Sequence, residues 1–350
     1  MRIGIMLPNW VGDVAMATPT LRALRKHFAG SELIGVVKPY VAAVLEGTSW
    51  LDRVFPWEHR GWRGMVASLR FVGQLRQQRI DTWVLLRNSL SAALVARASG
   101  AERIVGYRRN GRGLLLTDSL QPPRNAQGLV PISAVDYYLQ LAYSLGTPLE
   151  SQQLELATTP ADETQADAVW NRLGLPAGSD VVLLSSTGAY GSAKVWPVEH
   201  CAELAKRVSQ ELGKHVLVLC GPSERENAAA IVRYANHPQV KSLAEEKLSI
   251  GLSKALIRRS RLMITTDSGP RHLAAGLGTP TISLFGPTDP VWAENYQPGA
   301  VKLRLELDCS PCAKRVCPLG HHRCMRNLPV DRVLAAIWDQ LQIPAQRSAA

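Results

Sequence analysis

The 350-residue chain has 46% hydrophobic residues, 40 Lys and Arg, 29 Asp and Glu, and a formal net charge of +11. This length and apolar fraction are typical of a globular protein with two ordinary domains, and they exclude a largely disordered chain. Every apolar run is shorter than the roughly 20 residues that span a bilayer. The N-terminus MRIGIMLPNW lacks the pattern of a secretory signal. We therefore expect a cytoplasmic protein.

The positive charge is concentrated in the first part of the chain. Residues 1–150 hold 18 Lys and Arg against 10 Asp and Glu, whereas the rest hold 22 against 19. Such an excess suits nucleic acid, an anionic lipid surface or a phosphorylated small molecule. The arginines are scattered apart from GYRRNGRG at 106–113, and no nucleic-acid-binding module is evident. The pattern favours an anionic small molecule or a lipid-linked acceptor, with a merely solvated basic surface as the alternative.

Short apolar runs alternate with helix-length segments in the first half of the chain. The expected strands lie at 2–7, 32–37, 53–57, 81–86 and 103–107. The expected helices lie at 14–28, 63–78, 89–98 and 134–146. The Gly-, Pro- and Arg-rich stretch 107–135 is expected to be a loop that faces a ligand. Continuous apolar strands separated by helices predict a parallel sheet that is buried on both faces.

A second alternating series follows the polar segment TPLESQQLELATTPADE. Its expected strands lie at 181–186, 215–221, 240–244, 261–266 and 280–286. Its expected helices lie at 198–212, 224–235, 249–259 and 270–277. We expect an α/β fold with two doubly wound parallel sheets and a ligand held between the domains. The expected domains are 1–160 and 161–330, followed by a C-terminal helix and tail at 331–350.

The stretch PNWVGDVAM places Gly12 and Asp13 at the carboxyl end of the first expected strand, where a helix begins. Helix capping is one interpretation of Asp13, because a carboxylate there accepts from free backbone N–H groups and suits the helix dipole. A catalytic carboxylate is the other, since open α/β sheets bind ligands at this edge.

The stretch TTDSGPRHLAAGLGTPTISLFGPTDP ends a strand and opens a helix with Asp267, Ser268 and Gly269. A helix start with hydroxyls and a glycine is a ready site for a phosphate or diphosphate. His272, in the first turn, is expected to point into the same cleft. Helix capping explains Asp267 and Ser268. It does not explain why Thr, Asp, Ser, Gly and His residues all occur together at the carboxyl end of one strand.

The stretch SSTGAYGSAKVWP follows another expected strand and contains Thr187 and Lys194. Small hydroxyl and glycine residues suit an anion, and a lysine supplies a point charge to a departing phosphate. The Gly-Lys-Ser/Thr spacing of a nucleotide triphosphatase loop is absent. A lysine that is merely solvated is the alternative for Lys194.

These three stretches, in this order over nearly the whole chain, resemble the ADP-heptose:lipopolysaccharide heptosyltransferases of glycosyltransferase family 9. LPNWVGD and the tail CSPCAKRVCPLGHHRC are most similar to the heptosyltransferase II members. The resemblance implies an inverting GT-B enzyme with two Rossmann-like domains and no catalytic metal. It implies ADP-L-glycero-D-manno-heptose as donor, bound by the second domain, and a lipid-linked inner-core acceptor, bound by the basic first domain. The second heptose, added to heptose I, is the expected product.

The resemblance also implies roles for individual residues. Asp13 matches the catalytic base, next to Gly12, which leaves room for the acceptor. Thr187 and Lys194 match contacts to the donor phosphates. The diphosphate- and heptose-binding turn is matched by Asp267, Ser268, Gly269 and His272, with Ser268 where some relatives have Thr.

The adenosine end of the donor site is less defined. Glu224 or Glu226 in CGPSEREN is expected to accept from the ribose hydroxyls, and Lys247 and Leu248 to line the adenine. Each is also unremarkable as a surface residue.

Contact with the cytoplasmic face of the inner membrane follows only from the acceptor. Trp57 and Trp62, in VFPWEHRGWRG, suit either a membrane surface or packing. Alternatives to this enzyme are a relative that adds the first heptose or another sugar, a nucleotide-sugar-binding protein without turnover, and a nucleic-acid-binding protein, for which only charge argues.

The segment 309–324 contains four of the six cysteines, Cys309, Cys312, Cys317 and Cys324, with His321 and His322 between the last two. Disulfides are not expected in the cytoplasm, and this spacing suits a structural zinc ion held by four Cys or by three Cys and one His. Reduced cysteines that simply pack are the alternative.

Overall fold

The computed structural model describes residues 1–57, 61–126, 128–176, 178–186 and 191–342. The chain forms two compact units, Met1–Leu154 and Glu155–Ala350. The division lies shortly before the boundary expected at residue 160, within the extended stretch that leads to the first helix of the second unit. The last helix, near residue 330, belongs to the second unit rather than to a separate tail.

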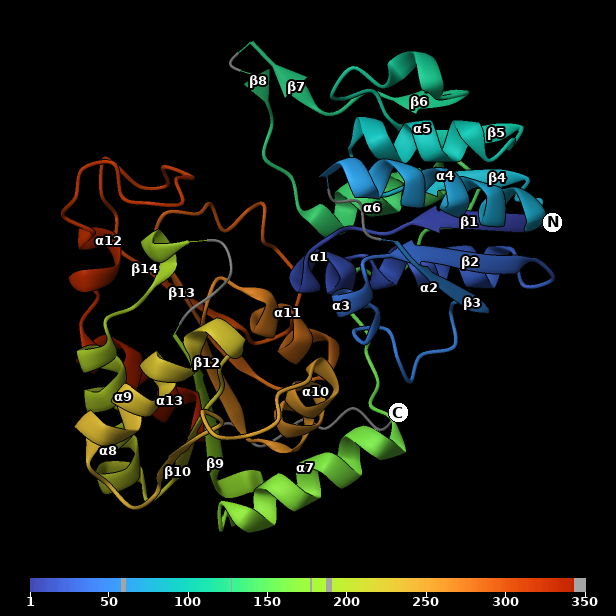
Figure 1. The fold of residues 1–350 in the computed structure, drawn as a ribbon. Coiled ribbons are helices and arrows are strands. Elements are labelled where there is room, and N and C mark those ends of the chain that lie inside the picture. Colours follow the sequence, from blue (N-terminus) through green and yellow to red (C-terminus); the bar gives the residue numbers. More distant parts are fainter. Residues whose placement is uncertain (58–60, 127, 177, 187–190, 343–350) are drawn as a thin grey trace. The chain divides into compact units, whose positions relative to one another are not determined.

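The first unit is built on a parallel sheet with the strand order β3-β2-β1-β4-β5-β6 (Figure 1). Its strands are β1 (Arg2–Met6), β2 (Glu32–Val37), β3 (Arg53–Pro56), β4 (Thr82–Leu85), β5 (Arg103–Tyr107) and β6 (Asp118–Leu120). Its helices are α1 (Val11–Met16), α2 (Thr18–His27), α3 (Pro39–Ala42), α4 (Gly61–Gln77), α5 (Leu90–Ala98) and α6 (Ala134–Tyr143), with a 3-10 turn η1 (Gly113–Leu115). A hairpin of β7 (Arg124–Asn125) and β8 (Gly128–Leu129) projects beyond β6. Helix α2 packs against α6, and α4 packs against α5.

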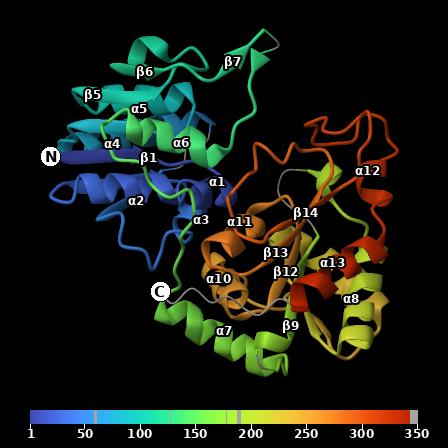
Figure 2. The same cartoon turned by 180° about the vertical axis from the view of Figure 1, so that it is seen from behind.

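The second unit repeats this plan with the order β11-β10-β9-β12-β13-β14 (Figure 2). Its strands are β9 (Val181–Ser185), β10 (His215–Val218), β11 (Val240–Ser242), β12 (Leu262–Thr266), β13 (Thr281–Phe285) and β14 (Val301–Arg304). Its helices are α7 (Pro160–Arg172), α8 (Val198–Leu212), α9 (Arg225–Ala235), α10 (Ile250–Arg259), α11 (Gly269–Gly276), α12 (Arg323–Arg326) and α13 (Val330–Gln342). Three 3-10 turns complete it: η2 (Gly178–Asp180), η3 (Ser192–Lys194) and η4 (Pro222–Glu224). Helix α8 packs against α9 and α13, whereas α10 packs against α7 and α11.

The strand order reverses at the same place in both sheets. In the first unit β1 pairs with both β2 and β4, and in the second β9 pairs with both β10 and β12, all in parallel. Parallel open sheets bind their ligands beyond the carboxyl ends of the strands at such a switch point. The prediction of two doubly wound α/β units is confirmed, and each unit has one such position.

Two local features differ from the expectation. The helix expected at 14–28 is divided at Ala17 into α1 and α2, because Pro19 has no N–H to continue the first helix and instead lies in the first turn of the second. Two of the four edge strands, β6 and β14, were not expected, because their sequences DSL and VKLR contain no continuous apolar run.

Trp57 is a packing residue. It is 5% exposed, and its ring lies parallel to that of Phe71 with 5.7 Å between the centroids. The membrane-contact interpretation of Trp57 is therefore wrong, and the side chain of Trp62 lies outside the described part. Within the described residues, each helix is too short or too polar to cross a membrane.

Candidate active site

Asp13 lies in the first turn of α1, directly beyond the carboxyl end of β1 at the switch point of the first unit. The residue at the N-cap is Trp10, which has an extended backbone and makes no side-chain cap hydrogen bond. Asp13 is therefore not the N-cap, although its charge still suits the helix dipole. Its side chain is half-buried, whereas Gly12 is buried. The carboxylate thus lies where an open sheet places its ligand.

A tyrosine of α6 lies close enough to Asp13 to respond to its charge. Tyr138 is 8% exposed, and burial, followed by the charges of Asp13 and Tyr137, raises the pKa of its hydroxyl well above the usual value. Tyr138 therefore stays protonated at any working pH. The tyrosine therefore adds no second charge near Asp13.

Lys194 and Asp267 form a buried ion pair at the switch point of the second unit. Lys194 Nζ lies 2.7 Å from Asp267 Oδ2 and 2.6 Å from the Asp267 carbonyl oxygen. The two residues follow neighbouring strands, since Ser185 of β9 is in register with Thr265 of β12. With side chains 10% and 7% exposed, neither residue is solvated. The interpretation of Lys194 as a merely solvated lysine is wrong.

The Asp267 carboxylate accepts a further hydrogen bond, of 2.7 Å, from the Thr288 hydroxyl. Burial acts to raise the pKa of Asp267, but the charge of Lys194 and the hydrogen bonds from Lys194 and Thr288 hold it below the ordinary value. Asp267 does not cap α11, because Ser268 is the N-cap residue there. Thr288 was missed by sequence reasoning, although it stands in the quoted GPTDP, directly beyond β13, which pairs with β12.

The start of α11 presents Ser268 and Gly269 beside this ion pair. The Ser268 hydroxyl makes no cap bond to the helix; it donates to the Thr266 carbonyl at 3.3 Å and lies 3.3 Å from the Thr265 hydroxyl. The second residue of the helix is Pro270, which has no N–H. The positive end of the α11 dipole therefore faces the carboxyl edge of the sheet. A diphosphate site requires such a positive helix end.

His272 is buried near the start of α11. It is 4% exposed, and its Nδ1 lies 3.5 Å from the Asn295 amide nitrogen. Burial, aided by the charge of Arg271, lowers its pKa to about 3. The imidazole is therefore neutral at physiological pH. The structure thus shows a buried His272, and its direction toward a ligand stays a prediction.

A second buried cation, Arg271, was also missed by sequence reasoning. It is fully buried, donates to Ser283 at 3.1 Å and to the Ala293 carbonyl, and lies over the Phe285 ring. These contacts fix α11 against β13. The only signal in the sequence was an arginine in an otherwise apolar helix start.

The Cys-rich segment supports the lysine loop. Ala193 donates its N–H to the Arg315 carbonyl at 3.0 Å, and His322 Nε2 lies 2.6 Å from the Ala193 carbonyl. Gly191, which begins the described part of the loop, has φ +151, and a Cβ there would lie 2.4 Å from the Arg315 carbonyl oxygen. The segment therefore holds the backbone that positions Lys194. Thr187, expected beside it, lies outside the described residues.

The side chains of the Cys-rich segment, residues 309–324, are not arranged as a set of metal ligands in this structure. All four of its cysteines are free thiols. Among the described residues, no group of three or more His, Cys, Asp or Glu side chains is arranged to hold a metal ion. The zinc expected at this segment stays a prediction.

The residues expected at the adenosine end differ in their exposure and in their contacts. Glu224 closes its own 3-10 turn, because its Oε2 accepts from the Gly221 N–H at 2.6 Å. It lies beyond β10, at the same edge of the sheet as Lys194. Glu226 and Lys247 are exposed and Leu248 is half-buried. One oxygen of Glu224 is thus already occupied, and its role toward ribose stays a prediction.

Comparisons with known proteins agree with this geometry. Residues 68–323 match the model of glycosyltransferase family 9 (heptosyltransferase). Lipopolysaccharide heptosyltransferase 2 of Escherichia coli is 27% identical over 95% of this chain and 97% of its own length. Lipooligosaccharide heptosyltransferase 2 of Campylobacter jejuni is 26% identical over 96% of this chain and 98% of its own.

Solved structures show the same fold. The ADP-heptose lipopolysaccharide heptosyltransferase II of E. coli superposes with a TM-score of 0.80 and 24% identity, covering 97% of this chain and 98% of that one. A family 9 glycosyltransferase of Veillonella parvula gives 0.82 and 22%, with 97% of both chains covered. These likenesses confirm the GT-B fold. The chain belongs to glycosyltransferase family 9, the heptosyltransferase family, and is a glycosyltransferase.

Proposed function

We propose that this enzyme transfers heptose from ADP-L-glycero-D-manno-heptose to the inner core of lipopolysaccharide, adding the second heptose to heptose I. The observation that carries the proposal is the ion pair of Lys194 and Asp267 at the switch point of the second sheet. The names of the relatives favour the second heptose, since both of the most similar ones described above are heptosyltransferases 2.

Asp13 is the base in this proposal. An acceptor hydroxyl that attacks the anomeric carbon must lose its proton, and a positioned carboxylate takes it within hydrogen-bond reach. Attack from the face opposite the leaving ADP inverts the anomeric centre. The half-buried position of Asp13, beyond the carboxyl end of β1 at the switch point of the first sheet, supports this role.

Lys194 stabilises the ADP leaving group. The diphosphate gains negative charge as the glycosidic bond breaks, and a cation in a dry site stabilises that charge strongly. Ser268 and Gly269 at the start of α11 add a hydroxyl and the helix dipole. Asp267 keeps the ammonium in place before the donor binds. In this proposal catalysis needs no metal ion.

A transfer assay tests the proposal directly. The purified enzyme receives ADP-heptose and lipid acceptors that carry zero, one or two heptoses. Transfer only to the acceptor with one heptose supports the proposal. Transfer to the heptose-free acceptor instead identifies an enzyme of the first step, and ADP-heptose binding without transfer to any acceptor contradicts the proposal.

Two further expectations belong to this proposal. The lipid-linked acceptor requires peripheral contact with the cytoplasmic face of the inner membrane, which the basic first unit supports through attraction to anionic lipids. We expect no nucleic-acid partner. Sedimentation with vesicles containing anionic lipid tests the membrane contact, and loss of the enzyme from the pellet with rising salt is the expected result.

A structural zinc ion at Cys309, Cys312, Cys317 and Cys324 is a separate proposal, supported by their spacing. Elemental analysis of enzyme purified without chelator tests it. One zinc per chain supports the proposal, and the absence of stoichiometric metal contradicts it.

A further inference from the structure

The outer sides of helices α4 and α5 each carry exposed leucine and arginine side chains in a row. In α5, Leu90, Leu94 and Arg97 are exposed and recur every three or four residues, which places them on one side of the helix. In α4, the exposed Leu69 and Arg76 lie about two helical turns apart. The buried residues of both helices pack in one hydrophobic cluster with strands β1, β2, β4 and β5. Both rows therefore point away from the sheet.

The rows of α4 and α5 lie side by side. The two helices are in contact, and Figure 1 shows them as neighbours in the upper part of the picture. Arg76 Nε donates to the Ala98 carbonyl oxygen at 2.7 Å and so joins the ends of the two helices. Leu69 is 71% exposed and Leu94 is 50% exposed. Each helix therefore presents a largely exposed leucine on the same surface of the unit.

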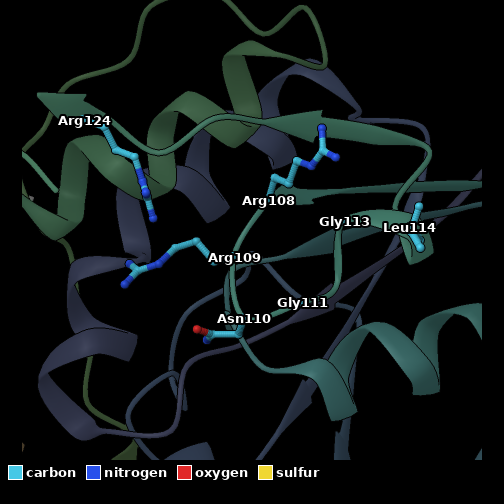
Figure 3. A pocket seen from close by; sticks show the side chains of 7 residues that line it. All are labelled: Arg108, Arg109, Asn110, Gly111, Gly113, Leu114 and Arg124. Carbon is cyan, nitrogen blue, oxygen red and sulfur yellow. The ribbon is translucent and has the colours of Figure 1, made fainter. Parts of the chain in front are cut away.

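A third leucine continues this surface beyond β5. The turn η1 contacts α5, and Leu115 and Leu116 pack on the core that α5 covers. Leu114, in contrast, is 96% exposed. Figure 3 shows Leu114 and Arg108 on one side of the loop that follows β5, whereas Arg109 extends to the other side. We define the outer face as Leu69, Arg70 and Arg76 of α4, Leu90, Leu94 and Arg97 of α5, and Leu114 of η1.

The outer face is basic and contains no acidic residue. The sequence from residue 59 to residue 117 contains 11 arginines but only two acidic residues, Asp81 and Glu102. These two directly precede β4 and β5, so they lie at the amino edge of the sheet and not on the helices. The charges of α2 are balanced instead, since Lys26 pairs with Glu150 at 2.9 Å. The outer face therefore attracts an anionic surface more strongly than α2 does.

Exposed leucines between arginines suit a lipid bilayer better than a protein partner. Apolar side chains enter the boundary between head groups and acyl chains, while cationic side chains remain at the anionic head groups. A protein interface has a core from which charged residues are depleted, whereas arginines separate the leucines of the outer face. Leu90 also lies directly beyond β4, which pairs with β1, the strand that leads to Asp13. The outer face thus begins at the edge of the sheet where a lipid-linked acceptor reacts.

We propose that the outer face docks on an anionic lipid bilayer, with its leucines inserted among the lipid head groups and its arginines at the lipid phosphates. This inference rests on the proposed transfer to a lipid-linked acceptor and adds the surface through which the enzyme reaches the membrane. The occupant is the lipid of the bilayer and not the sugar acceptor. Docking therefore takes place on vesicles that contain no acceptor.

The test measures binding of the purified enzyme to acceptor-free vesicles of phosphatidylethanolamine and phosphatidylglycerol. The variants L69Q/R70Q and L94Q/R97Q each remove one leucine and one arginine from the outer face. All four side chains are exposed, so we expect both variants to keep the melting temperature of the wild type. We expect the partition coefficient to fall at least about tenfold in each variant, because an inserted side chain and an ionic contact are lost.

The matched control is K26Q/L149Q, which removes one exposed leucine and one exposed lysine of the same unit outside the outer face. Helix α2, which carries Lys26, lies on the other face of the sheet. The connections from β1 to β2 and from β4 to β5 run in opposite directions across the sheet, and right-handed connections then lie on opposite faces. Vesicle binding of the control should stay within about twofold of the wild type, since charge acts over only about a Debye length.

Three results overturn the inference. Equal vesicle binding by the two outer-face variants and the control is one, and a wild type that does not bind these vesicles is another. The third is a wild-type dimer in sedimentation equilibrium that both outer-face variants convert to a monomer, because the outer face is then an interface between copies of the chain. Transfer to a detergent-solubilised acceptor tests the proposed function separately: we expect it to be unchanged in the variants, and its absence in the wild type overturns the proposed function instead.

Discussion

The ammonium of Lys194 lies 2.7 Å from the Asp267 carboxylate, although 73 residues separate the two in sequence. The pair is buried at the edge of a parallel sheet where a ligand is expected. A buried cation with a carboxylate partner is held in place, and its charge also acts on another anion close by. In the proposed function, a diphosphate that binds here shares Lys194 with Asp267.

The first prediction concerns the stability of this pair. K194M leaves the buried Asp267 carboxylate without its cation, and we expect the free energy of unfolding to fall by about 3 kcal/mol or more. The double variant K194M/D267N loses less, because no unpaired charge remains. Urea unfolding of both variants measures the difference. Equal losses in the single and double variants would show that the pair contributes no electrostatic stabilisation.

The second prediction is a pH dependence of stability caused by His272. Burial lowers its pKa in the folded protein to about 3, from an ordinary value of 6.5. Between these values the unfolded chain binds the proton and the folded chain does not, so stability rises with pH through this window. The contribution is complete above about pH 6.5 and is lost as the pH falls toward 3.

The variant H272N removes this titration. We expect the fall in unfolding free energy between pH 7.5 and pH 5 to be smaller in H272N than in the wild type, by up to about 1.4 kcal/mol per pH unit below 6.5. Unfolding curves at both pH values provide the measurement. An unchanged pH dependence in the variant contradicts a neutral buried histidine.

The third prediction concerns the support that the Cys-rich segment gives to the lysine loop. G191A places a methyl group 2.4 Å from the Arg315 carbonyl in a backbone conformation that is almost confined to glycine. We expect the loop to shift and kcat to fall more than tenfold. The control is G213A, at the C-cap of α8, where φ is +64 and no atom lies within 4 Å of the added Cβ.

In the control, only the left-handed conformation is penalised, by about 1–2 kcal/mol of stability. Activity in G213A therefore remains near that of the wild type while the melting temperature falls. If kcat falls equally in both variants, the loss reflects general destabilisation, and the proposed support of Lys194 by Arg315 and His322 is wrong.

The fold was predictable because its signals are local. Buried strands such as β9 and β12 are continuous apolar runs, and each is followed by small and polar residues that end it. The edge strands β6 and β14 carry no such signal, and the helix break at Ala17 depends on a single proline. Sequence alone therefore predicted the layers of both units and one edge strand of each sheet, β3 and β11, but not the other.

The site was predictable at the level of motifs and not of contacts. Lys194 and Asp267 each stood out, but their direct pairing depends on how two strand ends are registered and on the path of one lysine side chain. The burial of His272, which is 4% exposed, was not predicted, because a helix position does not reveal what packs over it. Arg271 was missed because a buried arginine with neutral partners, Ser283 and the Ala293 carbonyl, resembles a surface arginine in sequence.

The central claim is that Asp13 is the base of a heptosyl transfer, and the most direct measurement is turnover by D13N. We expect kcat to fall at least about a hundredfold, the usual scale for loss of a general base, while binding of ADP-heptose is unchanged. D136N is the matched control, since Asp136 is also half-buried in the first turn of a helix of this unit. Turnover of D136N should stay within about twofold of the wild type. Near-normal transfer by D13N would contradict the account.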